Sequence, residues 1–215
     1  MDTPRLLLTG FEPFDQDTVN PSWEVARALH GQRIEGVRVH ALLLPCVFGQ
    51  SLAVLQAGLR KHRPRLVLSL GLAPGRAELS VERVAINVDD ARIPDNAGAQ
   101  PIDQPVLAAA PAAHFSTLPI KAMVHAMLQA GVPAAVSQTA GTFVCNHVFF
   151  GLMHSLRRRP GVRGGFMHVP LLPEQAVQQG LPGLALDQQC LGVQLALATA
   201  LRVAADRQES GGSIA

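Results

Sequence analysis

Residues 133–156 read PAAVSQTAGTFVCNHVFFGLMHSL and contain a short apolar strand pattern, a turn and an apolar helix pattern. Residues 133–138 form the strand pattern, residues 139–141 are small enough for a tight turn, and 148–156 form the helix pattern. Cys145 therefore lies where a strand passes into a helix. The unpaired N–H groups and positive dipole end of a helix start favour a thiolate. This position indicates a nucleophile, with a buried, unreactive cysteine as the alternative.

The chain upstream of this stretch alternates between strand and helix patterns. Buried strands are predicted at 5–9, 37–44 and 66–70. A helix begins at Asn20-Pro21, because asparagine can cap and proline suits the first helical position, and a second helix spans 51–62. This order predicts an α/β fold, a three-layer α/β/α sandwich around a central, largely parallel but mixed and twisted sheet.

The later part of the chain has a different pattern. Residues 80–88 alternate like one strand, and 89–104 have the composition of a long functional loop. A short added strand is predicted at 114–118, a helix at 120–130, a strand at 164–169 and a long helix at 184–207. The tail from 209 to 215 is expected to be loose. Since no repeat or long linker interrupts the chain, residues 1–215 are expected to form a single domain.

The composition excludes several classes of protein. Of the 215 residues 48% are hydrophobic and 16% are charged, which is typical of a globular protein, and the net charge of +2 gives no reason to expect nucleic acid or membrane binding. The three cysteines form no C-x-x-C pair, which favours a reducing compartment. Without a signal-peptide pattern or a membrane-length apolar run, the expected location is cytoplasmic.

A nucleophilic thiol needs an imidazole partner and an orienting group. His168 closes the strand pattern at 164–169, and catalytic groups in open α/β sheets gather at carboxyl strand ends. His147 is too close to Cys145 on one helix to face it well. The candidate orienter is Glu82, a carboxylate in a mostly apolar strand pattern, with a plain ion pair to Arg83 or Arg92 as the alternative. The other carboxylates considered, which lie in a loop, more often stabilise turns than orient a histidine: Asp89, Asp90, Asp95 and Asp103.

Other chemistries have no support in the sequence. There is no His-Glu-x-x-His motif and no cysteine–histidine set at zinc spacing, so no metal is expected. No phosphate-binding fingerprint appears, and no cofactor is expected. The run Arg157–Arg159 complements a helix C-terminus, with partner binding as the weaker alternative.

Taken together, six motifs resemble the pyroglutamyl peptidase I family, also called pyrrolidone carboxyl peptidase. They occur in the family's order and cover almost the whole chain: LTGFEPF at 8–14, VNPS at 19–22, ERVAIN at 82–87, DDARIPDN at 89–96, GTFVCN at 141–146 and GFMHVP at 165–170. The resemblance implies a cysteine peptidase with a Glu82–Cys145–His168 triad. It also implies a cytosolic enzyme, commonly a homotetramer, with N-terminal pyroglutamyl peptides as its substrates.

The chain departs from the family pattern at three positions. Asp15 and Pro74 stand where family members often carry glycine, and Leu72 stands where they usually carry a glutamine thought to brace the pocket near Asn20. The loss of this glutamine puts that side-chain brace in doubt. The triad positions show no departure.

The implied reaction is hydrolysis of the amide bond after a pyroglutamyl residue through a thioester. Because pyroglutamate is a neutral lactam without a free amine, an apolar pocket with a few backbone hydrogen bonds suits it. The predicted substrate-binding residues are Phe11, Phe14, Asn20, Val47, Leu72, Ile93, Phe143 and Val144. Arg92 and the Cys145 N–H are the oxyanion candidates. A thiol amidase for another acyl amide and a non-catalytic lactam-binding protein are the alternatives.

Overall fold

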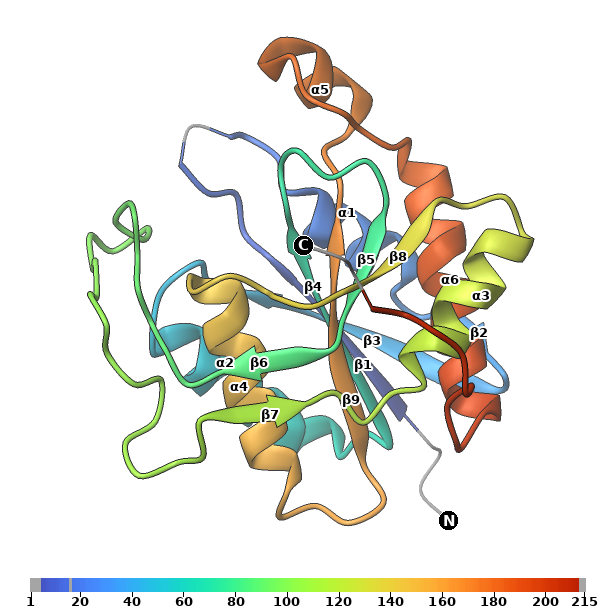
Figure 1. Cartoon of the computed structure of the whole chain (residues 1–215), viewed down its shortest axis with the longest axis horizontal. Coiled ribbons are helices and arrows are strands. Elements are labelled where there is room, and N and C mark those ends of the chain that lie inside the picture. Colours follow the sequence, from blue (N-terminus) through green and yellow to red (C-terminus); the bar gives the residue numbers. More distant parts are fainter. Residues whose placement is uncertain (1–4, 16, 213–215) are drawn as a thin grey trace.

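A seven-stranded mixed sheet forms the centre of the computed structural model, which describes residues 5–15 and 17–212 (Figure 1). The strand order is β2-β3-β1-β4-β9-β5-β8. β1, β3, β4 and β9 run parallel, whereas β5 and β8 are parallel to each other and antiparallel to β9. The strands are β1 (Arg5–Phe11), β2 (Arg33–Ile34), β3 (Val37–Leu44), β4 (Leu66–Leu72), β5 (Leu79–Glu82), β8 (Ala134–Ser137) and β9 (Arg163–Val169).

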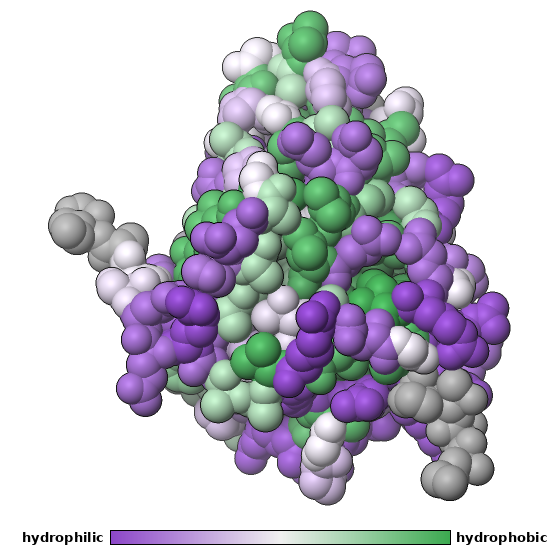
Figure 2. All heavy atoms as spheres, turned by 90° about the vertical axis from the view of Figure 1, so that its right-hand side faces the viewer, coloured by the Kyte–Doolittle hydropathy of each residue, from purple (hydrophilic) through white to green (hydrophobic). Residues whose placement is uncertain are grey.

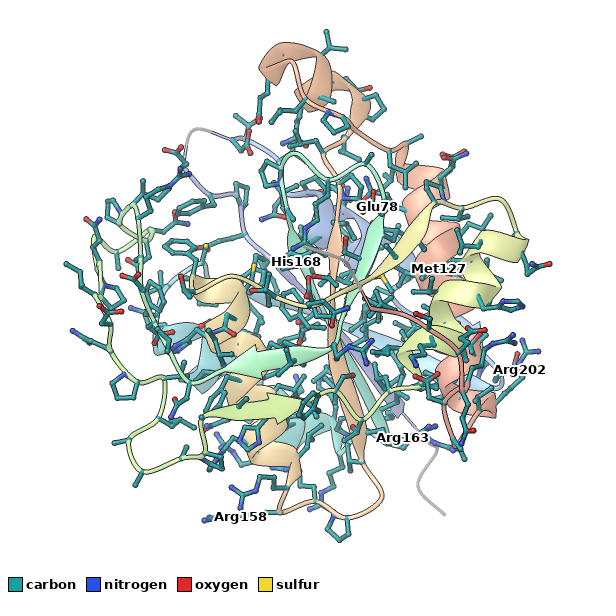
Figure 3. All side chains as sticks on the ribbon, in the orientation of Figure 1. Glu78, Met127, Arg158, Arg163, His168 and Arg202 are labelled. Carbon is teal, nitrogen blue, oxygen red and sulfur yellow. The ribbon has the colours of Figure 1, made fainter. Side chains whose placement is uncertain are left out.

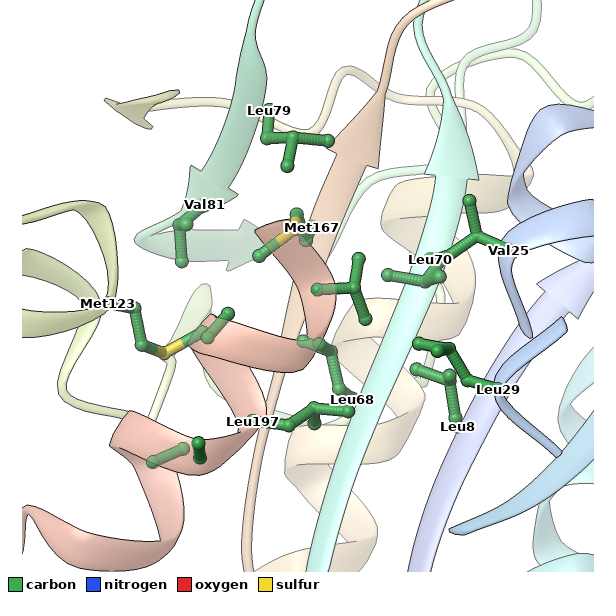
Figure 4. Packing of buried hydrophobic residues seen from close by; sticks show 14 of the residues in the cluster. Leu8, Val25, Leu29, Leu68, Leu70, Leu79, Val81, Met123, Met167 and Leu197 are labelled. Carbon is green, nitrogen blue, oxygen red and sulfur yellow. The ribbon is translucent and has the colours of Figure 1, made fainter. Parts of the chain in front are cut away.

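Helices cover both faces of this sheet. Because neighbouring residues of a strand point to opposite faces, Leu6 and Leu8 pack in one core cluster and Leu7 in the other. The first cluster includes residues of α1 (Pro21–Leu29), α3 (Ile120–Gln129) and α6 (Leu186–Arg202), and Figure 4 shows part of it. The second includes residues of α2 (Gln50–His62) and α4 (Val144–Leu156). The predicted three-layer α/β/α fold is thus confirmed.

The strand predicted at 80–88 is wrong in one respect, because the chain leaves the main sheet at Arg83. β5 ends at Glu82, and β6 (Val84–Ile86) pairs with β7 (Ala113–Phe115) in a separate two-stranded sheet. Asn146 of α4 holds β6 in this place: its Oδ1 accepts from the Ile86 N–H at 3.0 Å, and its Nδ2 donates to the Ile86 carbonyl at 2.9 Å. Because the chain leaves the main sheet here, Glu82 is the last residue of β5, the strand that pairs with β9.

Element boundaries also differ from the prediction. α4 begins at Val144, four residues before the predicted start, so Cys145 lies in its first turn. α6 ends at Arg202 instead of residue 207, and the short elements β2 and α5 (Pro173–Gln179) were not predicted. In the part of the chain that the structure describes, no helix combines the length and apolar character needed to cross a membrane.

The outer side of α3 and α6 mixes apolar and polar groups, as Figure 2 shows from the right-hand side of Figure 1. Leu128 of α3 is 52% exposed and Leu191 of α6 is 41% exposed. Single apolar side chains of this kind are ordinary on protein surfaces, so they define no function.

The segment after α6 contacts the rest of the chain at two places. Asp206 precedes the tail that was expected to be loose, 209–215, of which residues 213–215 lie outside the described part, and Gly211 lies within it. Asp206 accepts hydrogen bonds from the N–H groups of Lys121 at 3.1 Å and Ala122 at 2.9 Å. These donors lie in the first turn of α3, whose N-cap, Pro119, makes no side-chain cap. Farther along, the Gly211 carbonyl accepts from Arg83 Nη2 at 2.9 Å. This segment therefore caps α3 and reaches the end of β5.

We expect Asp206→Ala to destabilise the protein by about 1 kcal/mol, because two N–H groups of α3 lose their acceptor. For a chain of this size the melting temperature should fall by about 2–4 °C. Asp206→Asn keeps a side-chain oxygen and should retain most of the stability. Thermal unfolding of the three proteins checks this, and an unchanged melting temperature in Asp206→Ala would show that Asp206 contributes nothing to α3.

Candidate active site

The antiparallel register of β5 and β9 brings Glu82 and His168 together. Ser80 lies opposite His168, and since side chains alternate along a strand, Ser80, Glu82 and His168 share one face of the sheet. Glu82 is thus the diagonal neighbour of His168. Its Oε1 lies 2.7 Å from His168 Nδ1, and both side chains are buried. A carboxylate here fixes the tautomer in which Nδ1 carries the proton and Nε2 has the free lone pair.

Gly71 makes room for the sulfur of Cys145 beside this pair. On β4, Gly71 is the register partner of His168. A Cβ at residue 71 would lie 2.7 Å from Cys145 Sγ and 2.8 Å from Phe166 Cζ, which is closer than real Cβ contacts. The first turn of α4 therefore packs its thiol onto a strand position that carries no side chain, next to the strand of His168.

Cys145 and His168 line one cavity of about 600 Å³. Its other lining residues come mostly from loops: Phe11, Phe14, Asp15, Asp17, Asn20, Cys46, Leu72, Pro74, Arg92, Ile93, Ala140, Phe143 and Gln179. The rings of Phe14 and Phe143 contact each other with centroids 5.2 Å apart, and Phe48 supports Phe143 from the other side at 5.3 Å. The cavity thus joins two reactive groups to an aromatic wall.

Six of the eight predicted substrate-binding residues line this cavity, and so does Arg92. Val47 and Val144 are not among its described lining residues. Val144 is fully buried in the apolar cluster of α2 and α4, because α4 begins at this residue and turns its side chain into the core. Val47 is also buried, at 7% exposure. Gln179 was missed because no signal predicted α5.

Asn20 is held by its own neighbours, without the glutamine that Leu72 replaces. Its Oδ1 accepts from the backbone N–H of Ser22 at 3.1 Å and from the Ser22 hydroxyl at 2.8 Å, while its Nδ2 donates to the Glu12 carbonyl at 2.9 Å. The Ser22 hydroxyl oxygen also accepts from the Phe11 N–H at 3.0 Å. The Phe11–Phe14 loop is therefore fixed to the start of α1, and Leu72 adds apolar surface to the cavity.

The loop that carries Arg92 and Ile93 is anchored at two aspartates. Asp89 Oδ2 lies 2.7 Å from His147 Nδ1, so His147, two residues after Cys145, helps to hold this loop. The Asp95 carboxylate accepts from three backbone N–H groups, those of Phe48, Ala97 and Ala99. These carboxylates serve turns and loop anchoring, as predicted for their class.

Arg76 is a residue of this site that the sequence did not indicate. Its Nη1 lies 2.8 Å from Glu82 Oε1, the same oxygen that His168 contacts, and its Nη2 donates to the Thr139 carbonyl at 3.1 Å. The alternative considered for Glu82, an ion pair with Arg83 or Arg92, is wrong in its partner: the cation is Arg76, and Arg83 donates to Gln138 and Gly211. A loop arginine six residues upstream carries no sequence signal, because its reach depends on how the loop folds.

The electrostatics of the site differ from the expected thiolate. Burial and, to a smaller degree, the charge of Glu82 raise the pKa of the Cys145 thiol to about 12, although Arg76 lowers it. Burial also lowers the pKa of His168, against the opposing hydrogen bond and charge of Glu82. Both shifts favour the neutral forms, a thiol and an imidazole.

The described part of the chain contains no group of three or more histidine, cysteine, aspartate or glutamate side chains placed to hold a metal ion. The chemistry available from the described side chains is thus a thiol, an imidazole that can take its proton, a carboxylate that orients the imidazole, and an apolar cavity around them.

Two curated proteins with similar sequences are pyrrolidone-carboxylate peptidases. The pyrrolidone-carboxylate peptidase of Cupriavidus taiwanensis is 60% identical over 214 residues, covering 98% of this chain and 99% of the relative. The pyrrolidone-carboxylate peptidase of Klebsiella pneumoniae is 57% identical over 209 residues, covering 97% of this chain and 98% of the relative. Both comparisons extend over nearly the full length.

Solved structures agree with the sequence comparison. Pyroglutamyl peptidase I of Bacillus amyloliquefaciens superposes with a TM-score of 0.93 at 45% identity, covering 95% of this chain and 100% of that one. Pyrrolidone carboxyl peptidase of Thermococcus litoralis gives a TM-score of 0.89 at 36% identity, covering 93% and 94%. The family model described as pyroglutamyl peptidase matches residues 4–203. On this evidence, the chain belongs to the pyroglutamyl peptidase family of cysteine peptidases.

Proposed function

We propose that this protein removes an N-terminal pyroglutamyl residue from peptides, with Cys145 as nucleophile, His168 as general base and acid, and Glu82 as orienter. The observation that carries the assignment of roles is the buried Glu82–His168 contact of 2.7 Å on the cavity that Cys145 also lines. Family membership supports the substrate class. Figure 3 labels the position of His168, the proposed general base.

The cavity suits a neutral lactam. Pyroglutamate has a flat five-membered ring without a charged amine, so an enzyme must bind it by apolar contact and hydrogen bonds. Phe11, Phe14 and Phe143 provide aromatic surface on the cavity, and Leu72 and Ile93 add aliphatic surface. The lactam brings no charged amine that these apolar side chains would have to desolvate, which favours it over an ordinary N-terminus beside them.

The proposed proton transfers start from a neutral Cys145 thiol and a neutral His168 imidazole. As Cys145 Sγ attacks the pyroglutamyl carbonyl carbon, His168 Nε2 takes the thiol proton, and Glu82 stabilises the imidazolium that forms. His168 then gives this proton to the departing amine, which leaves a thioester on Cys145. Next, His168 takes a proton from water as the water attacks the thioester carbonyl. The C–S bond then breaks and releases pyroglutamic acid, and His168 returns its proton to the Cys145 sulfur.

The start of α4 can stabilise the oxyanion. Its N-cap, Phe143, offers no side-chain cap, so the first N–H groups of the helix, including that of Cys145, have no side-chain acceptor. Arg92 is our second donor: it is an exposed residue on the cavity, and its guanidinium has no carboxylate partner among the described residues. An arginine free of an ion pair can turn toward developing negative charge.

We also infer that residues 1–215 act as one catalytic domain in the cytoplasm and that the protein is a homotetramer. The support is the resemblance to the family, whose model matches residues 4–203. Sedimentation at several protein concentrations tests the assembly.

We expect Cys145→Ala and Cys145→Ser to remain folded and to lose turnover of a pyroglutamyl reporter amide by a factor of about 10⁴ or more. Alkylation of the wild-type thiol should have the same effect, and pyroglutamate in the cavity should slow it. Cys190→Ala is the matched control, since Cys190 lies on α6 away from the cavity.

A folded Cys145→Ala protein with near-normal turnover would refute the thiol mechanism. If the wild-type protein binds pyroglutamate but turns over no reporter amide, the alternative of a lactam-binding protein holds. Turnover of other acyl amides at similar rates would favour a broader thiol amidase.

Glu82→Gln should lower kcat by about 100-fold or more with a smaller change in KM, because the imidazolium loses its negative partner while the substrate contacts stay. The melting temperature should be measured with the kinetics. A destabilised variant with wild-type kcat would mean that Glu82 serves only as an ion-pair partner of Arg76.

The value of kcat/KM should stay high as the pH falls below 6.5, the ordinary pKa of histidine. His168 acts as a base only when neutral, and since burial lowers its pKa below 6.5, it stays neutral as the pH falls past that value. Activity should decline only when the pH reaches the lowered pKa. Circular dichroism at each pH separates this from unfolding, and an acid midpoint above 6.5 would contradict the neutral resting imidazole.

A further inference from the structure

Glu82 uses one oxygen for two partners. Its Oε1 lies 2.7 Å from His168 Nδ1 and 2.8 Å from Arg76 Nη1. We propose that Arg76 is a positioning residue for the reaction, which holds Glu82 against His168 and joins this pair to the turn that precedes Cys145. This inference rests on the proposed function.

The burial of Glu82 explains why a cation is needed. The Glu82 side chain is fully buried, and its Oε2 has no hydrogen-bond partner among the described residues. A buried carboxylate with one unsatisfied oxygen is unfavourable unless an opposite charge compensates it. Burial lowers the pKa of His168, which disfavours an imidazolium as that charge. Arg76, with 27% of its side chain exposed, combines a charge at the carboxylate with access to solvent.

The second contact of Arg76 reaches the turn that precedes α4. Nη2 donates to the Thr139 carbonyl at 3.1 Å, and the Thr139 Oγ1 accepts from the Gly141 N–H at 3.1 Å. Residues 139–141 lead from β8 to the first turn of α4, where Cys145 lies. One planar guanidinium therefore connects the strand that carries the orienter with the turn that places the nucleophile. A lysine, with a single nitrogen, cannot reproduce this fork.

A guanidinium in this place also acts on the nucleophile. The charge of Arg76 lowers the pKa of Cys145, against burial and Glu82, which both raise it. Loss of the arginine should therefore slow thiol alkylation at a fixed pH, and this effect can be measured without turnover.

The test compares Arg76→Met and Arg76→Lys with the wild-type protein. We expect Arg76→Met to lower kcat about 10- to 100-fold, the effect of one hydrogen bond to a charged group, with KM changed less than about threefold. Arg76→Lys should recover the alkylation rate, because the charge remains, and only part of kcat, because one contact is lost. Arg83→Met is the matched control, as Arg83 adjoins Glu82 but donates to Gln138 and Gly211.

A double-mutant cycle with Glu82→Gln separates positioning from a merely structural role. If Arg76 acts through Glu82, adding Arg76→Met to Glu82→Gln should lower kcat less than about threefold further. Independent multiplicative losses, or Arg76→Met with kcat within twofold of wild type, would overturn the proposal. A wild-type protein without peptidase activity would refute the proposed function instead, whereas the alkylation rates would still report the contact of Arg76 with the site.

Discussion

The buried contact between Glu82 and His168 is the constraint on which the site depends. A carboxylate and an imidazole can meet in the interior only if both backbones are fixed, and here adjacent antiparallel strands fix them, with Ser80 opposite His168. β5 runs antiparallel to β9 and ends at Glu82. The chain then leaves the main sheet, and β6 pairs with β7 beside α4. The antiparallel pairing of β5 with β9 therefore places these two buried side chains beside each other.

The second requirement is a strand surface without a side chain beside that contact. Gly71 satisfies it, since any Cβ at this position would collide with Cys145 Sγ and Phe166. Helix α4 can then approach the sheet at its N-terminus, where its N–H groups are free. β5, β9 and the start of α4 thus bring Glu82, His168 and Cys145 to one place. The loops supply most of the other residues that line the cavity.

The sequence predicted much of this architecture, and its failures have physical reasons. The parallel strands were predictable because strands buried on both faces are continuously apolar, and Cys145 and His168 were noticeable because they adjoin strand–helix junctions. The break at Arg83 was not predictable, because the side chain of Asn146, sixty residues away, holds β6 out of the sheet. Arg76, Gln179 and the bonds of Asp206 depend likewise on contacts between distant segments. The thiol was expected to be acidified by the helix terminus, but burial has the larger effect.

The neutral thiol of the resting site has a consequence for the durability of the protein. Peroxides and other oxidants attack thiolates far faster than thiols, so a cysteine that becomes nucleophilic only while His168 takes its proton is a poor target between turnovers. In the proposed mechanism an acyl group also occupies the sulfur for part of each cycle. The raised pKa of Cys145 thus has a second effect, because a low thiolate fraction slows oxidation of the sulfur to sulfenic and sulfinic acids.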